Sequence, residues 1–437
     1  MKITGWKPVL RYSLQPINCG LQAWRSLTPM MYPGSSSELT DIRRLTHLRD
    51  DYRAGLLSDT IPFWTKHGVD REHGGIMTAL ARDGSVIDTD KGVWVQGRFT
   101  WMMGELFNNV EPRGEWLELA RSGARFLEQH CFDPADGRMW FHVTREGKPI
   151  RKRRYAFSES FAAIAFGELA LATGDDRYAA RARQTFERFI DHNLNPQNRQ
   201  PKFTSTRPTR SIGFPMIAIA TAQELRQSIG LDIASEWIDR AIDWIRTVHV
   251  HEEIECVMET VDPEGGIVDH FDGRMLNPGH AIEAAWFIMQ EGSLRDEREL
   301  IELGCRMLDW MWQRGWDQEY GGILYFTDVY GHPVQEYWHD MKFWWPQNET
   351  IIATLMAYQL TGNVKYLQWH QQIHDWTYRH FPDPEHGEWF GYLHRDGRIS
   401  STLKGNLWKG PFHIPRMQLI CWKLMEKILA SQSGAAS

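Results

Sequence analysis

The stretch Asp70-Arg-Glu-His-Gly-Gly75, which runs on into Ile76-Met-Thr-Ala-Leu-Ala-Arg-Asp-Gly84, decides the fold of this chain. It predicts a turn followed by a short β-ribbon that reverses at an Asp-Gly pair. Similar turns recur at Asp133–Gly137, Asp262–Gly266, Asp317–Gly322 and Asp383–Gly387, with a weaker copy at Asn195–Asn198. Successive turns start 55 to 67 residues apart, so the chain contains six units of similar length.

Between the turns the pattern is helical. Apolar residues three and four positions apart predict a helix over 155–172 that ends at Gly174, and a second helix from about Asp176 to about Leu194. The same join recurs over 360–366. Six such helix pairs predict an all-α fold, an (α/α)6 barrel with short β-ribbons in the loops at one mouth. An open α-solenoid is the alternative, but the long loops all fall at the same end of each pair, which favours a closed ring.

The domain boundaries follow from the reach of this pattern. We expect the barrel to occupy residues 38–430 and residues 431–437 to form a flexible tail. Residues 1–37, which end in Pro33-Gly-Ser-Ser-Ser37, do not join the repeats, and we expect an extension without a catalytic role.

Composition excludes several classes of function. The formal charge of −7 argues against nucleic-acid binding, and the one basic run, 151–154, is predicted to be a solvated loop. No apolar run is long enough to cross a membrane. No phosphate-binding loop, dinucleotide-binding glycine pattern or serine-hydrolase elbow occurs. The 21 tryptophans favour a site that stacks on sugar rings over a purely helical core.

Cysteine usage indicates the compartment. The five cysteines are scattered and form no C-x-x-C pair: Cys19, Cys131, Cys256, Cys305 and Cys421. This pattern suits a reducing environment and excludes a cysteine-based metal site by spacing. We therefore expect a cytoplasmic protein.

Offsets from the turns locate a candidate site. Arg98, Glu159, Trp345 and His413 lie 26 to 30 residues after the aspartate of their turn, and His280 lies 18 residues after Asp262. Each falls near the start of the helix that follows its ribbon. Because those helices would form the inner ring, the five side chains should converge at one mouth.

Two histidines share a setting. His280 in Asn277-Pro-Gly-His280 and His413 in Lys409-Gly-Pro-Phe-His413 each follow a Pro/Gly break at a helix start. There the positive end of the helix dipole disfavours imidazolium, which leaves the neutral imidazole that a general base requires. Glu283, three residues after His280, can orient it, and Arg416, three residues after His413, can bind an anionic oxygen.

Other candidates leave two interpretations open. Trp345, which lies close to Glu349 in the sequence, is either a stacking platform or core. Arg98 is either an oxyanion clamp or half of a structural ion pair. The pair His370/His374 has zinc-like spacing but is predicted to be a polar helix face, and the segment 249–253 is predicted to be a solvated helix end.

Six segments together resemble the N-acylglucosamine 2-epimerase (renin-binding protein) family, and the match is co-linear over about 38–430. The segments are Lys91–Arg98, Phe157–Phe161, Asn277–Glu283, Met341–Pro346, Gly387–Gly391 and Phe412–Arg416. The resemblance implies an (α/α)6 barrel, often a homodimer, that interconverts N-acetylglucosamine and N-acetylmannosamine.

The resemblance also implies roles for residues. It places the catalytic histidines at His280 and His413, the clamping arginine at Arg98 and site glutamates at Glu283 and Glu349. We expect the substrate-binding set to be Glu283, Glu349, Arg416, Trp345, Trp94 and Glu159. No metal is required, and ATP is implied only as an activator that is not consumed. Gln347 stands where many members of the family carry histidine, and the segment 214–217 lacks a histidine that related sugar epimerases and isomerases carry, so both departures bear on the choice of sugar.

The implied chemistry is inversion at C2 of an open-chain sugar. One histidine removes the C2 proton, Arg98 stabilises the enolate, and the other histidine protonates the opposite face. Alternatives on the same fold are a disaccharide 2-epimerase or mannose isomerase, an inverting glycoside hydrolase that uses two of Glu159, Glu283 and Glu349, and a non-catalytic binding protein.

Overall fold

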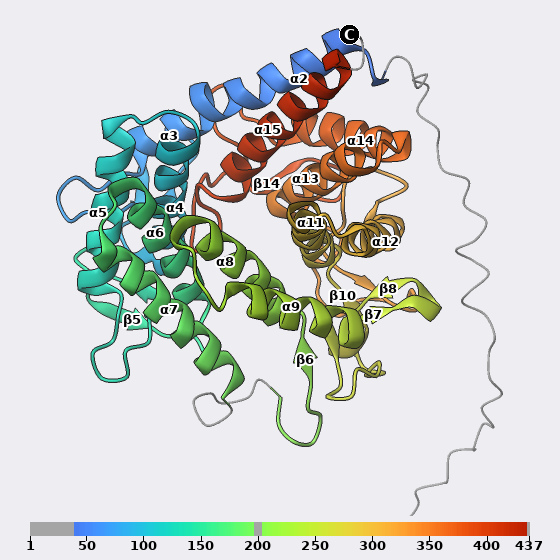
Figure 1. Ribbon diagram of the computed structural model, residues 1–437, viewed down its shortest axis with the longest axis horizontal. Coiled ribbons are helices and arrows are strands. Elements are labelled where there is room, and N and C mark those ends of the chain that lie inside the picture. Colours follow the sequence, from blue (N-terminus) through green and yellow to red (C-terminus); the bar gives the residue numbers. More distant parts are fainter. Residues whose placement is uncertain (1–38, 196–202, 435–437) are drawn as a thin grey trace, which may run out of the picture.

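Two concentric rings of helices form the molecule (Figure 1). The computed structural model describes residues 39–195 and 203–434. The inner ring comprises α4 (Val93–Asn109), α6 (Phe157–Thr173), α8 (Gly213–Ile229), α11 (Pro278–Arg295), α13 (Trp344–Thr361) and α15 (His413–Gly434). The outer ring comprises α2 (Ile42–Ala54), α5 (Gly114–His130), α7 (Asp176–Leu194), α9 (Ala234–Trp244), α12 (Arg298–Gly315) and α14 (Val364–His380).

The two ends of the described chain close the ring. Five helix pairs are consecutive in the chain, whereas the sixth is made by α15 and α2, which lie side by side in Figure 1. A π-helical turn (Gly55–Thr60) joins α2 to α3 (Ile61–His67). The predicted (α/α)6 barrel is therefore confirmed, and the open solenoid is wrong.

Burial distinguishes the rings. Every residue of α6 from Ser158 to Ala170 is buried, whereas α7 buries one stripe that includes Phe186 and Phe189. Close packing of inner helices requires small residues at the contacts. A Cβ added to Gly97 of α4 would lie 2.9 Å from the backbone of Phe161 on α6.

The predicted helix joins are confirmed. Helix α6 ends at Gly174 and α13 at Gly362, both with positive φ, which glycine adopts without steric cost. The Asp175 and Asn363 side chains then cap the next helix by accepting a backbone N–H. Helix α15 continues to Gly434, beyond the expected start of the tail.

Short antiparallel strands link neighbouring repeats at one mouth. In each link, the strand that precedes an inner helix pairs with the ribbon of the following repeat. The links are β3 (Lys91–Gly92) with β4 (His142–Val143) and β5 (Pro149–Arg151); β6 (Arg210–Ser211) with β9 (Thr260–Val261); β10 (Met275–Leu276) with β11 (Thr327–Asp328); and β12 (Lys342–Phe343) with β13 (Tyr392–Leu393) and β14 (Ile399–Ser401). Two further hairpins are β1 (Ala79–Leu80) with β2 (Val86–Asp88) and β7 (Val250–His251) with β8 (Cys256–Val257).

The aspartates that open the turns anchor these links. Asp317 is buried and binds Lys342 at 2.9 Å and Arg395 at 2.8 Å. Asp70 binds Lys91 and Arg145, and Asp383 binds Lys404 and Arg82, in the same way. Arg82 belongs to the first ribbon and Asp383 to the last turn, so this ion pair also closes the ring. The sequence predicted these aspartates only as turn residues.

Two predictions for histidines outside the site are wrong. His249 is fully buried, and its Nδ1 lies 2.9 Å from the Met258 carbonyl, so it is not a solvated helix end. His370 is likewise buried, with its Nε2 3.0 Å from the Tyr52 hydroxyl, so it does not lie on a polar helix face. Burial lowers the pKa of His249 to about 4 and that of His370 to about 3.

Two expectations lie wholly or largely outside the described residues, namely the extension over 1–37 and the weak turn at Asn195–Asn198. The cysteines of the described segments are all buried and free. Within those segments, no helix is both long enough and apolar enough to span a bilayer.

Candidate active site

The barrel encloses a cavity of about 930 Å³ that all six inner helices line. At the ribbon end its walls carry His280, His413, Arg98, Trp345 and Trp94. The predicted convergence of inner-helix starts on one mouth is confirmed for these residues.

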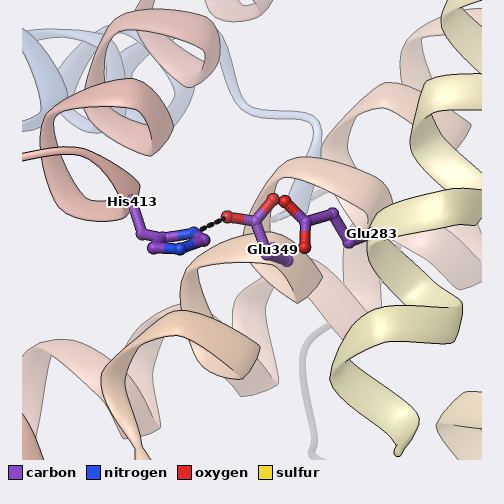
Figure 2. A group of neighbouring side chains, drawn as sticks. All are labelled: Glu283, Glu349 and His413. Carbon is purple, nitrogen blue, oxygen red and sulfur yellow. Dashed lines mark hydrogen bonds and ion pairs between the residues drawn. The ribbon is translucent and has the colours of Figure 1, made fainter. Parts of the chain in front are cut away.

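His413 begins α15 and is backed by a carboxylate. Its Nδ1 lies 2.6 Å from Oε1 of Glu349 on α13 (Figure 2). An ionised carboxylate can only accept, so Nδ1 carries the proton and Nε2 keeps a free lone pair. Burial, together with the nearby charges of Arg416 and Arg98, holds the pKa of His413 well below its usual value. His413 therefore rests as a neutral imidazole, the form of a general base.

Arg416 joins the two glutamates of the site. Its Nη2 donates to Oε1 of Glu283 at 2.6 Å and to Oε1 of Glu349 at 2.7 Å. The other oxygen of Glu349 accepts from the Trp286 indole N–H at 2.9 Å. The guanidinium is thus bound to two carboxylates of the protein. This differs from the expectation that Arg416 binds an anionic oxygen of the substrate.

His280 is backed by a residue that the sequence did not indicate. Its Nδ1 lies 3.0 Å from Oε2 of Glu259, which sits between β8 and β9. The expectation that Glu283 orients His280 is wrong, because Glu283 pairs with Arg416. Glu259 precedes His280 by 21 residues and belongs to another element, so no helical spacing links the two.

The pKa of His280 also differs from the expectation. Burial acts to lower this pKa, but the charge and hydrogen bond of Glu259, with a contribution from Glu283, outweigh burial and raise it. Direct contact with a carboxylate thus accompanies a shift opposite to the one expected from the place of His280 at a helix start. The two imidazoles have pKa values that are shifted in opposite directions.

The Trp345 indole contacts both histidines. Its ring centroid is 5.0 Å from that of His280 and 5.9 Å from that of His413. Gly279 lets it approach, because a Cβ there would lie 2.7 Å from the indole. Trp345 is thus both packed and part of the cavity wall.

Arg98 faces the cavity without a carboxylate. Among the described residues it forms no ion pair, and its guanidinium carbon lies 4.1 Å from the Phe161 ring centroid and 4.7 Å from that of Phe412. Burial, and then the charge of Arg416, lowers the pKa of Arg98 to about 9. Of the two interpretations of Arg98, the structural ion pair is wrong, and a free cation in an aromatic wall favours binding of an oxyanion.

The aromatic wall extends to the mouth. Trp94 packs against Trp408 and Phe141, with ring centroids 5.8 and 5.4 Å away. Arg153, from the basic run predicted to be a solvated loop, instead lines the cavity there, with its guanidinium carbon 5.3 Å from the Trp408 ring centroid. The mouth therefore combines flat apolar surfaces with a cation.

Glu159 is not a cavity residue, contrary to the prediction. It is fully buried behind α6, where Oε1 accepts the Met139 backbone N–H at 2.8 Å. Gln96 and Gln347 hold the equivalent ribbons in the same way, by bonding to Ile76 and Ile323. Glu159 and Gln347 are therefore ribbon anchors, which gives Gln347 a structural role.

One group of ligating side chains in the site has the spacing of a metal centre. Atoms of Glu283, Glu349 and His413 lie within 4.8 Å of one another, and Figure 2 shows the two carboxylates converging from α11 and α13. The Arg416 guanidinium, however, lies within hydrogen-bonding distance of both carboxylates and supplies the balancing positive charge. These residues fit an ion-pair network better than a metal site.

This fold and site define an enzyme of proton transfer, with two carboxylate-backed imidazoles facing one aromatic cavity. Comparison with known proteins agrees. Residues 74–414 match the family model described as N-acylglucosamine 2-epimerase. The chain is 34% identical to N-acylglucosamine 2-epimerase of Bos taurus over 394 residues, which cover 87% of this chain and 92% of the relative. It is 35% identical to that of Mus musculus, with 85% and 91% covered.

The chain belongs to the N-acylglucosamine 2-epimerase family and is an isomerase. Its fold is shared with a solved structure of cellobiose 2-epimerase from Spirochaeta thermophila, with a TM-score of 0.76, 21% identity, and 89% and 98% of the two chains covered.

Proposed function

We propose that this enzyme interconverts N-acyl-D-glucosamine and N-acyl-D-mannosamine by inverting C2 of the open-chain sugar. The observation that carries the proposal is the pair of imidazoles in one cavity that both contact Trp345, each bound through Nδ1 to a carboxylate. Identity of about 34% to mammalian enzymes of that name supports the choice of substrate.

The chemistry follows from the acidity of C2. The C1 carbonyl makes the C2 proton removable, and breaking the C2–H bond leaves its electrons in an enolate with charge on O1. We assign removal to Nε2 of one histidine and delivery of a proton to the opposite face to Nε2 of the other. Arg98 is the free cation that can stabilise O1. Each turnover moves one proton off C2 and one onto it, so the substrate itself supplies all the electrons.

The glycoside-hydrolase alternative is less well supported. It needs two carboxylates that face the scissile bond, one of them protonated. Glu159 lies outside the cavity, and Glu283 and Glu349 are both bound by the Arg416 guanidinium. That alternative would also leave both imidazoles without a role.

Exchange of the C2 proton in deuterium oxide tests the proposal. Wild-type enzyme incubated with N-acetylmannosamine should yield N-acetylglucosamine deuterated at C2, as followed by proton NMR. The variants His280→Asn and His413→Asn should each abolish epimerisation. Each should still exchange the C2 proton of one epimer only, the two variants acting on opposite epimers, because one base remains on one face.

The control variant is His47→Asn, which changes an exposed imidazole on α2 and should behave as wild type. Exchange of both epimers by either active-site variant would contradict the two-base assignment. Parallel incubations with glucose, mannose and cellobiose test the sugar, and the N-acyl sugars should be preferred.

We further propose a cytoplasmic homodimer, in agreement with the free buried cysteines and the resemblance to the family. Light scattering coupled to gel filtration tests the dimer. ATP remains a prediction as an activator that is not consumed, and initial rates with and without ATP, with ADP monitored, test it.

A further inference from the structure

We infer that Glu259 is a positioning residue that makes His280 the member of the histidine pair that rests with the proton. The inference rests on the proposed function, because it assigns His280 the role of acid. It identifies which carboxylate determines the starting protonation state of the site.

The backbone around Glu259 holds its side chain in place. The residue lies between β8 and β9, and its carbonyl accepts the Ile212 N–H at 3.0 Å, just before α8. Its side chain is 13% exposed, and its Oε2 is 3.0 Å from Nδ1 of His280. The Asn277 side chain accepts the backbone N–H of His280 and fixes the start of α11. The Asn277 amide nitrogen also lies 3.1 Å from Nδ1 of His280, so Glu259 and Asn277 together hold the imidazole by its Nδ1 edge.

The two carboxylate partners differ in how their charge is balanced. Glu349 shares its Oε1 between His413 and Arg416, and the two cations near His413, Arg416 and Arg98, already balance the two carboxylates Glu349 and Glu283. Glu259 has no such cation, because His280 is its one ion-pair partner among the described residues. A proton on His280 is thus balanced by Glu259, whereas a proton on His413 would add a second positive charge beside Arg416.

The other groups around His280 do not replace Glu259. Glu283, on the same helix, is paired with Arg416, and Arg416 and His413 on α15 oppose a further positive charge. Arg98 on α4 acts with Arg416 to balance Glu283 and Glu349, and Tyr325 lies near Glu259 as a phenol whose pKa burial raises. Glu259 is therefore the carboxylate whose removal should change the proton affinity of His280 most.

The expected consequence is a shift of the alkaline limb in the profile of kcat/KM against pH. An active pair holds one proton, so kcat/KM falls at high pH when His280 loses it. In Glu259→Gln the neutral amide no longer favours imidazolium, and the alkaline limb should move down by about one pH unit or more. At pH 8 this lowers kcat/KM about tenfold. The ratio of kcat/KM in the two directions should stay unchanged, because the equilibrium constant fixes it.

The matched control is Glu264→Gln, the same change at an exposed site a few residues along the same segment. It should leave the limb where it is. Glu259→Asp keeps the charge with a shorter reach, and its limb should lie between those of wild type and Glu259→Gln. A limb that moves equally in all three variants would overturn the inference.

A second measurement is independent of turnover. NMR titration of the His280 imidazole, assigned by its loss in His280→Asn, should show a lower midpoint in Glu259→Gln than in wild type. An unchanged midpoint overturns the inference even if the variant is slow. If wild type does not epimerise any N-acyl sugar, the proposed function fails, while the midpoint still decides whether Glu259 holds the proton on His280.

Discussion

The two halves of the barrel have the same architecture and unequal chemistry. Helices α11, α13 and α15 supply both histidines and the network of Glu283, Glu349 and Arg416. In the ribbon-end site, helices α4 and α6 supply Arg98 and aromatic side chains. The repeat therefore provides six similar positions that carry different side chains, and under the proposed function proton transfer falls to one half and charge stabilisation to the other.

The turns of the two halves, in contrast, are alike. Asp70 in the first half and Asp317 in the second each bind a buried lysine and an arginine from the next ribbon. The turn ion pairs are thus alike in the two halves, whereas the residues of the site differ between them. Variants in each half can test this separation.

The largest effect is expected from Glu349→Gln in the second half. The amide can present its NH2 group to Nδ1 of His413, which moves the imidazole proton to Nε2 and removes the base. By analogy with catalytic triads, kcat should fall about 10³- to 10⁴-fold. Initial rates in both directions measure this loss, with circular dichroism to confirm folding. A loss below tenfold would show that Glu349 does not determine the tautomer.

The next effect is on stability and should be equal in the two halves. Asp317→Asn and Asp70→Asn each leave a buried lysine without its carboxylate, which should lower the free energy of unfolding by about 3–5 kcal/mol. Urea denaturation at pH 7 measures it. The exposed pair of Asp243 and Arg246 provides the control, because Asp243→Asn should cost less than about 1 kcal/mol.

The ion pairs of Asp317 also predict how their contribution to the stability of the fold changes with pH. Burial acts to raise the pKa of Asp317, but Arg395 and Lys342 outweigh it and lower that pKa to about 2. Because the folded pKa lies below the unfolded value, this stabilisation is complete above about pH 4 and is lost as pH falls toward 2. A difference between wild type and Asp317→Asn that grows on acidification would contradict this account.

A smaller effect is expected in the first half, from Arg98→Met. Loss of the free cation beside the cavity should lower kcat/KM about 10²- to 10³-fold. Arg98→Lys keeps the charge without the planar fork and should fall between that variant and wild type. Steady-state kinetics distinguish the two, and full activity in Arg98→Met would place all the chemistry in the second half.

The smallest effect is expected from Glu159→Gln, at the ribbon anchor. We expect kcat within twofold of wild type, because the side chain does not reach the cavity. Burial raises the pKa of Glu159, so the folded state favours the protonated carboxyl. As the pH rises through this raised pKa, the carboxyl ionises and the folded wild type becomes less stable. The variant should therefore gain stability, by about 1 kcal/mol, more at pH 8 than at pH 5. Thermal unfolding at the two pH values measures the gain.

Most of the fold could be predicted because its signals are local. The helix expected from about Asp176 to about Leu194 forms over Asp176–Leu194, since the cap at Asp175 and the glycine before it act within a few residues. The repeated turns then provided the number of helix pairs. Their role as buried ion-pair centres depends on contacts between repeats, which spacing alone does not reveal.

The site could be predicted only in part, for a geometric reason. An offset from a turn places a residue near a helix start, but each further residue rotates the side chain by about 100° around the axis. His413 and Arg98 therefore reach the cavity, whereas Glu159, at a similar offset, points behind its helix. Glu259 could not be found because it lies on a loop between two short strands, and no helical spacing relates it to His280.

The pairing of α2 with α15 has a consequence for biosynthesis. The helix that completes the ring is the last described one to leave the ribosome, and it carries His413 and Arg416. Until it docks, Glu283 and Glu349 would face each other across the gap without their shared cation. Like charges so close would hold that wall apart. Under the proposed function, a nascent chain thus gains its reactive centre in the same event that closes the barrel.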